Sequence, residues 1–171
     1  MRKLVTPAKA GAQLLLAVLA PLAALGQGAT FTTKSLTPET ALKAAQAALA
    51  KCRADGYQVA VAIVDRSGTT QVMLRDRFAG AHTPDYAVNK AWTAVSFRTN
   101  TTDMEKATRP GQPMAGVRNI PRFASVGGGM MIQGGGSLLG GIGVSGAPGG
   151  EADDACAAAG IKAISDDLEL G

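Results

Sequence analysis

The first regular pattern along the chain is a run of apolar residues at helical spacing. Its members are Leu42, Ala45, Leu49 and Cys52. Thr37 precedes the run as a capping residue, Pro38 suits the first helical position, and Gly56 is a residue type that ends helices. The pattern predicts a helix that begins at Pro38 and ends near Gly56.

Two β-branched segments follow and predict a hairpin. They span residues 58–64 and 69–74, and the turn residues 65–68 separate them. Residues 75–82 then leave the predicted sheet as a loop.

The sequence Thr83-Pro84-Asp85 repeats the combination of cap, proline and acid, and it predicts a second helix over residues 84–97. A stripe of small side chains on this helix suits close packing on a sheet: Ala87, Ala91, Ala94 and Val95. A capping-box pattern at residues 102–105 predicts a short third helix.

Glycine fills 12 of the 24 positions from 127 to 150. That composition alone suggests disorder, but apolar residues interrupt the glycines at strand spacing. We therefore expect short strands at 123–126 and 130–133 and a longer strand at 137–145. The last helix is expected from about Glu151.

The longer strand has one nearly bare face. That face carries Leu139, Gly141, Gly143 and Ser145, and the other carries Leu138, Gly140, Ile142 and Val144. A bare strand face admits a packed helix or a planar ligand at close range. We expect the first and last helices of the domain to cover it.

The order of these elements indicates the fold class. Hairpins favour an antiparallel sheet, and helices before, between and after the strands favour cover on both of its faces. The sequence therefore predicts an α+β fold.

A basic head and a short apolar run open the chain. Arg2, Lys3 and Lys9 accompany an apolar run over residues 14–25, and small residues precede Gln27. This arrangement is typical of a signal peptide over residues 1–26. We expect a lead-in at 27–36, a single domain at 37–171, and a periplasmic or secreted protein with no membrane span in its mature form. An uncleaved N-terminal anchor is the alternative.

The charge balance argues against nucleic acid as a partner. The chain carries 17 basic and 13 acidic residues, a net charge of +4. Three of the basic residues lie in the expected leader, so the mature charge falls to +1. No run of Lys and Arg with interleaved aromatic residues remains to follow a phosphate backbone.

Cys52 and Cys156 are the two cysteines, and both lie on predicted helices. Export would put them where disulfides persist, and a bridge would close a loop of about 100 residues. Two separately buried thiols are the alternative, and the sequence leaves both open. Neither cysteine has the spacing of a metal or haem-attachment motif.

His82 is the only histidine and comes just before the second helix. One interpretation is that His82 binds the iron of a planar anionic ligand, with arginines on its carboxylates. The candidate arginines are Arg75, Arg77 and Arg98. The alternative is a solvated loop histidine.

Other charged residues have plainer interpretations. Glu151, Asp153 and Asp154 are interpreted as partners of the dipole of the last helix. Lys90 and Arg98 are interpreted as residues of a solvated helix face.

Four sequence blocks carry a family resemblance: VAVAIVD at 59–65, NKAWTA at 89–94, GGIGVSGA at 140–147 and DACAAAG at 154–160. They are similar to blocks of the GlcG/HbpS family of haem-binding or haem-degrading domain proteins. The resemblance extends over about residues 36–168. One departure is the run from Gly127 to Met131, where many relatives have a Gly-Gly-Val-Pro-like run.

The resemblance implies a profilin-like α/β/α sandwich with a five-stranded antiparallel sheet and helices on both faces. It also implies a symmetric homo-oligomer, haem as the cofactor, and a possible sensor kinase as a partner, since some members bind haem and a secreted member degrades it.

Three functions follow for testing. The first is an exported haem-binding protein that buffers, senses or degrades haem. The second is a cofactor-free enzyme acting on a small organic acid or aromatic catabolite, with Asp65, His82 or Lys90 as acid or base. The third is an oligomeric scaffold without a ligand.

Overall fold

The first helix, α1 (Pro38–Ala54), begins as its sequence predicts. The Thr37 hydroxyl accepts a hydrogen bond from the Thr40 amide at 3.2 Å, and Pro38 occupies the first helical position. The computed structural model describes residues 29–169. The chain divides into Met1–Thr32 and Thr33–Gly171, and the second unit holds all the elements below. The predicted signal peptide at 1–26 lies outside the described residues.

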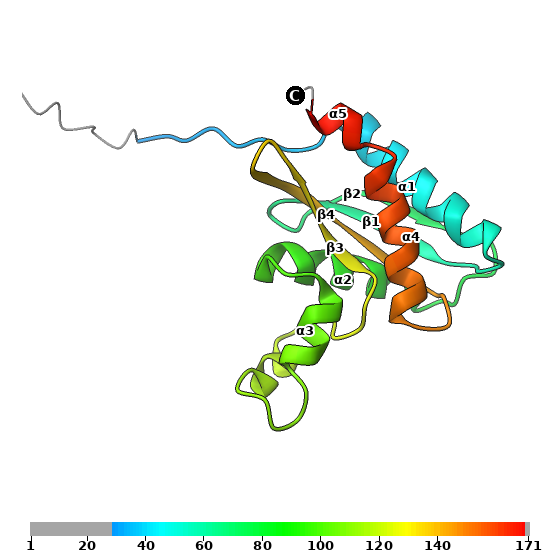
Figure 1. Ribbon diagram of the computed structural model, residues 1–171, viewed down its shortest axis with the longest axis vertical. Helices are drawn as coiled ribbons and strands as arrows, with labels where there is room; N and C mark the ends of the chain where they lie inside the picture. The colour runs from blue at the N-terminus through cyan, green and yellow to red at the C-terminus, as the bar shows by residue number, and fades with distance from the viewer. Residues whose placement is uncertain (1–28, 170–171) are drawn as a thin grey trace, which may run out of the picture. The chain divides into compact units, whose positions relative to one another are not determined.

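The strands form one antiparallel sheet in the order β2-β1-β4-β3 (Figure 1). Their bounds are β1 Ala60–Asp65, β2 Thr70–Arg75, β3 Gly129–Gly134 and β4 Ser137–Ser145. β1 and β2 form the predicted hairpin, and β3 and β4 form a second one. The central pair, β1 and β4, joins the two halves of the chain.

The expected strand at residues 123–126 is absent, so within residues 29–169 the sheet has four strands rather than five. The Ala124 amide donates to the Thr93 hydroxyl at 2.9 Å instead of to a neighbouring strand. The Phe123 ring packs edge-to-face on Phe97, with the ring centroids 5.4 Å apart. These contacts tie the segment to the second helix and remove it from the sheet.

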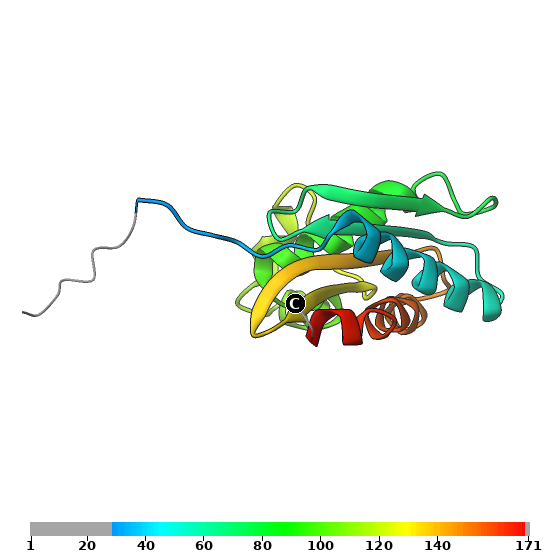
Figure 2. The same cartoon turned by 90° about the horizontal axis from the view of Figure 1, so that it is seen from above.

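Helices cover both faces of the sheet (Figure 2). One face contacts α2 (Thr83–Phe97), and the other contacts α1 and α4 (Gly150–Lys162). Three shorter helices complete the described elements: α3 Thr101–Ala107, the 3₁₀ helix η1 Ala115–Asn119, and α5 Ser165–Glu169. None of the helices in residues 29–169 has both the length and the apolar character needed to cross a membrane.

The bare face of β4 is covered by α2, so the expectation that α1 and α4 cover it is wrong. A methyl group built on Gly143 would lie 2.0 Å from the Ala87 carbonyl oxygen, and one on Gly141 would lie 2.9 Å from the Ala91 carbonyl oxygen. Glycine is required here because the helix backbone takes the space of a side chain.

The side-chain alternation along β4 changes where its pairing with β3 slips between Ile132 and Gln133. Leu138 consequently packs with Val64 beside α2, whereas Leu139 joins the core on the other face. The sequence interpretation had these two leucines reversed, because an irregular strand pairing breaks the period of two.

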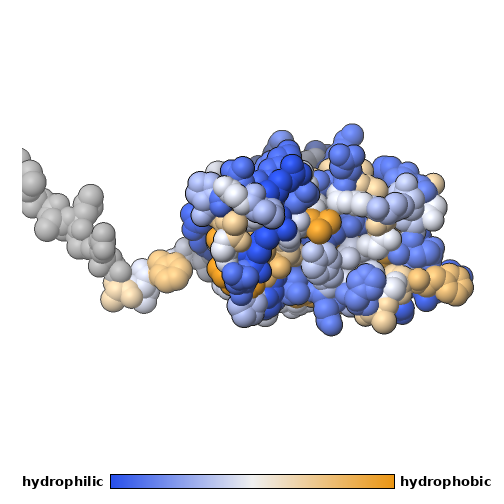
Figure 3. Space-filling view, turned by 90° about the horizontal axis from the view of Figure 1, so that it is seen from below, coloured by the Kyte–Doolittle hydropathy of each residue, from blue (hydrophilic) through white to orange (hydrophobic). Residues whose placement is uncertain are grey.

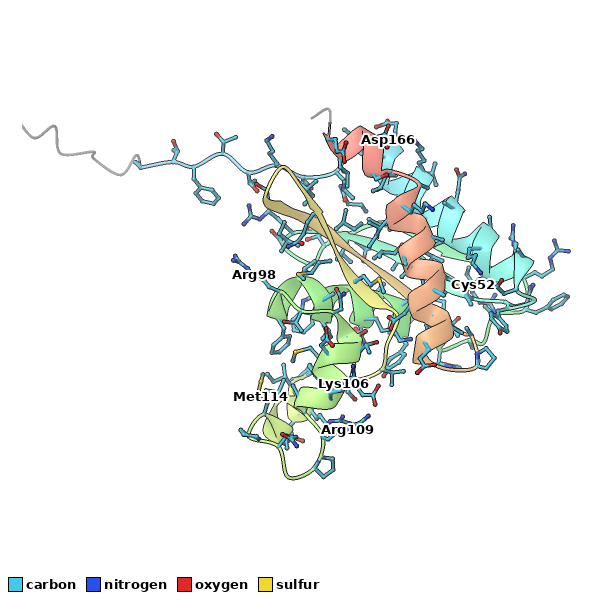
Figure 4. The ribbon with its side chains drawn as sticks, viewed as in Figure 1. Cys52, Arg98, Lys106, Arg109, Met114 and Asp166 are labelled. Carbon is cyan, nitrogen blue, oxygen red and sulfur yellow. A yellow bond between two sulfur atoms is a disulfide. The ribbon has the colours of Figure 1, made fainter. Side chains whose placement is uncertain are left out.

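Helices α1 and α4 lie side by side, and a disulfide joins Cys52 to Cys156 across them (Figure 4). Both cysteines are fully buried. Gly160 lets the helices approach closely, since a methyl group there would lie 2.7 Å from the Ala44 carbonyl oxygen. Of the two alternatives for the cysteines, the structure has the bridged one.

Candidate functional site

A cleft of about 660 Å³ opens where the first turns of α2 meet the loop before α4. Its wall is completed by the residues that lead into β1 and by the connection from β2 to α2. Its lining residues include Tyr57, Gln58, Phe78, His82, Tyr86, Lys90, Val126 and Asp153. The glycine-rich segment Gly146–Gly149 also lines it.

A buried ion pair forms part of the cleft wall. The Lys90 Nζ lies 2.6 Å from the Asp153 Oδ2, and each side chain is less than 5% exposed, at 1% and 4%. Lys90 also donates to the Val144 carbonyl at 2.9 Å, and the Asp153 Oδ1 accepts from the Ala147 amide at 3.0 Å. Helices α2 and α4 are therefore linked through charges that have left water.

Burial acts on both partners of this pair. It lowers the pKa of the Lys90 ammonium, and the Asp153 carboxylate opposes that change. It raises the pKa of the Asp153 carboxyl, and Lys90 opposes that change in turn. Each charge therefore depends on the other to remain in the interior.

The interpretation of Lys90 as a solvated residue is wrong. Lys90 lies three residues after Ala87 and directly before Ala91, so it belongs to the buried stripe of α2. This helical spacing was the sequence signal that could have identified Lys90 as buried. Asp153 does more than stabilise the helix dipole, and Asp154 accepts from the Gly128 amide at 2.5 Å and from the Thr102 hydroxyl.

His82 and Tyr86 lie one helical turn apart and both line the cleft. Burial raises the pKa of the Tyr86 phenol, so its hydroxyl stays protonated at neutral pH. The Lys90 Nζ lies 5.3 Å from the centroid of the Tyr86 ring. His82, rather than Thr83, is the residue that precedes α2, and Thr83 donates to the Gly80 carbonyl at 2.8 Å.

None of the three predicted arginines is among the residues that line the cleft with His82. Arg75 donates to the Ala79 carbonyl, and Arg77 is exposed in the same connection before α2. Arg98 ends α2 at the opposite end from His82 (Figure 4). A helix of this length is about 22 Å long, so the structure does not bring Arg98 and His82 together.

The acid–base residues of the alternative enzyme are also separated. The Asp65 Oδ1 accepts from the amides of Ser67 and Thr69, at 2.8 and 2.9 Å, so it stabilises the β-hairpin turn. Only His82 and Lys90 of the three line the cleft. Within residues 29–169, no group of three or more His, Cys, Asp or Glu side chains could hold a metal ion.

Asp76 fixes the connection that carries His82. Its buried carboxylate accepts two hydrogen bonds from the Arg53 guanidinium, at 2.7 and 3.0 Å, and one from the Arg77 amide at 2.8 Å. The hydrogen bond from Arg53 lowers the pKa of Asp76, and the Arg77 amide adds to the effect, while burial opposes it.

Substitution of Asp76 by asparagine should therefore destabilise the protein in a pH-dependent way. The lowered folded-state pKa makes the stabilisation complete above about pH 4, and it is lost as the pH falls through that lowered pKa. We expect the difference in free energy of unfolding between wild type and Asp76→Asn to be constant near neutral pH and to shrink below about pH 4. Urea unfolding at a series of pH values measures it. Asp103→Asn is the control, because Asp103 and Lys106 are both exposed. A difference that grows on acidification would contradict the assignment.

Comparison with known proteins gives a consistent match. A family model described as "Haem degrading protein HbpS-like" matches residues 36–162. Among curated proteins, the chain is 34% identical over 114 residues to an uncharacterised 15.0 kDa protein of Citrobacter freundii from the dhaT-dhaS intergenic region. That match covers 66% of this chain and 80% of the relative.

Solved structures agree. A double mutant of HbpS from Streptomyces reticuli is 39% identical, with a TM-score of 0.76, and the match covers 85% of this chain and 97% of that one. The PduOC:haem complex is 30% identical, with a TM-score of 0.71, and the match covers 76% of this chain and 95% of that one.

Proposed function

The chain belongs to the HbpS-like family, and we propose that it is an exported haem-binding protein that holds haem in the cleft beside His82. The observation that carries the proposal is the position of the only imidazole of the chain in a cleft of about 660 Å³. The similarity to a protein solved as a haem complex supports it.

The residues of the cleft fit such a ligand. The His82 side chain is exposed and is not engaged in capping α2. A haem iron already has four porphyrin nitrogens, so a single imidazole suffices as a protein ligand. A volume of about 660 Å³ is typical of cofactor sites. Tyr57, Tyr86 and Ala147 offer apolar surface to a macrocycle.

Haem would supply a redox-active iron centre, and the chain would supply its environment. His82 offers the imidazole nitrogen, and Tyr86 offers a protonated hydroxyl one turn further along α2. The Lys90–Asp153 pair joins α2 to the start of α4 in the wall of the cleft. These features suit buffering, sensing or degradation of haem.

The proposal also covers the location of the protein, its oligomeric state and its partner. The pattern over residues 1–26 supports export to the periplasm or outside the cell. The family resemblance supports a homo-oligomer, and a sensor kinase as partner stays a prediction.

Titration of the full protein with haemin tests the function. We expect a red-shifted, saturable Soret band for the wild type. His82→Ala should lose roughly tenfold or more in affinity, because the iron loses its protein ligand.

Arg98→Ala is the matched control and should bind as the wild type does, since Arg98 lies at the far end of α2. Identical spectra and affinity for wild type and His82→Ala would remove His82 from the site. A wild type without a saturable Soret change would contradict haem binding itself.

A further inference from the structure

Phe78 is an aromatic side chain that is exposed to water in the cleft. It is 78% exposed and lines the cleft. On the face drawn in Figure 3, hydrophilic residues predominate and hydrophobic ones form small patches. Of the six large hydrophobic side chains exposed in the described part of the chain, Phe78 and Val126 both line this cleft. Apolar surface that converges on a cleft indicates a ligand that covers it.

The turn that carries Phe78 is held on both sides. Before it, Asp76 is 1% exposed, bonds the Arg53 guanidinium, and donates from its amide to the Val59 carbonyl at 2.9 Å. After it, Ala79 is 2% exposed, and its amide donates to the Asp76 carbonyl at 3.2 Å. The phenyl ring is therefore presented by a preorganised turn, and preorganisation lowers the entropy cost of binding.

The cleft is lined by two kinds of side chain, apolar and charged. Its apolar side chains come from separate segments of the chain: Tyr57, Phe78, Val126, Ala147 and Pro148. Its charged side chains are the Lys90–Asp153 pair, which is already satisfied by internal hydrogen bonds. A small acid would find no unpaired cation there, whereas a broad apolar plane would find several partners.

We propose that Phe78 is a clamp that packs on the face of a planar aromatic macrocycle in the cleft and so selects for planar ligands. The inference rests on the proposed function, since the macrocycle is then a porphyrin. Phe78 recognises the aromatic plane, and His82 recognises the iron. The two residues therefore make separable contributions to affinity, which an iron-free ring can distinguish.

The test uses the full protein with two probes, haemin and iron-free protoporphyrin IX, and follows each by absorbance or porphyrin fluorescence. Phe78→Ala should weaken both probes by roughly tenfold, because a buried aromatic contact is lost in either case. His82→Ala should weaken haemin and leave protoporphyrin IX within about twofold. Phe78→Trp keeps a ring and should restore most of the affinity.

Leu42→Ala is the matched control, because Leu42 is 39% exposed on α1 and does not line the cleft. It should leave both affinities unchanged. A Phe78→Ala protein that binds both probes within twofold of wild type overturns the clamp and leaves the haem function standing. A change in mass by light scattering without a change in affinity also overturns it, because Phe78 would then be part of a contact between copies. A wild type that binds neither probe overturns the proposed function and the clamp together.

Discussion

Replacement of Lys90 by methionine lowers the free energy of unfolding by about 3–5 kcal/mol. Methionine fills much of the volume of the lysine stem, so the main effect is electrostatic. The substitution leaves the Asp153 carboxylate, 4% exposed, without its counter-charge, and leaves the Val144 carbonyl without its donor. An isolated buried charge is far more costly than the pair. Urea unfolding followed by circular dichroism measures the loss.

Removal of both charges should recover part of that stability. In the double variant Lys90→Met, Asp153→Asn, no buried charge remains, and the asparagine oxygen can still accept from the Ala147 amide. Lys106→Met is the control for losing a lysine, since Lys106 and Asp103 are each 65% exposed and their pairing contributes little. If Lys90→Met cost no more than Lys106→Met, the ion pair would not be what links α2 to α4.

Loss of the disulfide should lower the free energy of unfolding by a comparable amount. It does so by releasing a constraint on the unfolded chain. Cys52 and Cys156 are 104 positions apart, and a bridge over a loop of about 100 residues stabilises a protein by up to about 4.7 kcal/mol in the chain-entropy model. We expect the double variant Cys52→Ala, Cys156→Ala to lose about 3–5 kcal/mol. Denaturant unfolding of the oxidised wild type and the double variant gives the difference.

Reduced wild type provides the matched comparison for this prediction. Once reductant has opened the bridge, its unfolding midpoint should approach that of the double variant, because both lack the constraint on the unfolded chain. Both sulfurs are buried, so reduction should be slow without denaturant. A double variant as stable as the oxidised wild type would show that the bridge contributes no stability.

Local signals predicted most of the fold. Thr37 and Pro38 marked the start of α1, and the small-residue stripe of α2 predicted its close packing on the sheet, although not on the glycine-bearing face of β4. The prediction of a strand at residues 123–126 was wrong. The β propensity of these residues does not reveal that the Ala124 amide donates to the Thr93 hydroxyl. The predicted faces of Leu138 and Leu139 were reversed, because the sequence does not reveal the irregular pairing of β4 with β3.

The candidate site was less accessible from the sequence. His82 was singled out because it is the only imidazole, and it does line the cleft. Arg75, Arg77 and Arg98 were grouped with His82 by charge alone. Whether an arginine can share a ligand with His82 depends on the distance between them, and for Arg98 the length of α2 sets that distance. Lys90 and Asp153 are far apart in sequence, so their pairing follows only from the way α2 and α4 are placed around β4.

A crystal structure of the haemin-saturated protein tests the central claim most directly. We expect porphyrin density in the cleft, with the iron bonded to His82 and the ring against Phe78. Density for the porphyrin away from this cleft, or a saturated protein whose crystals hold none, would contradict the account.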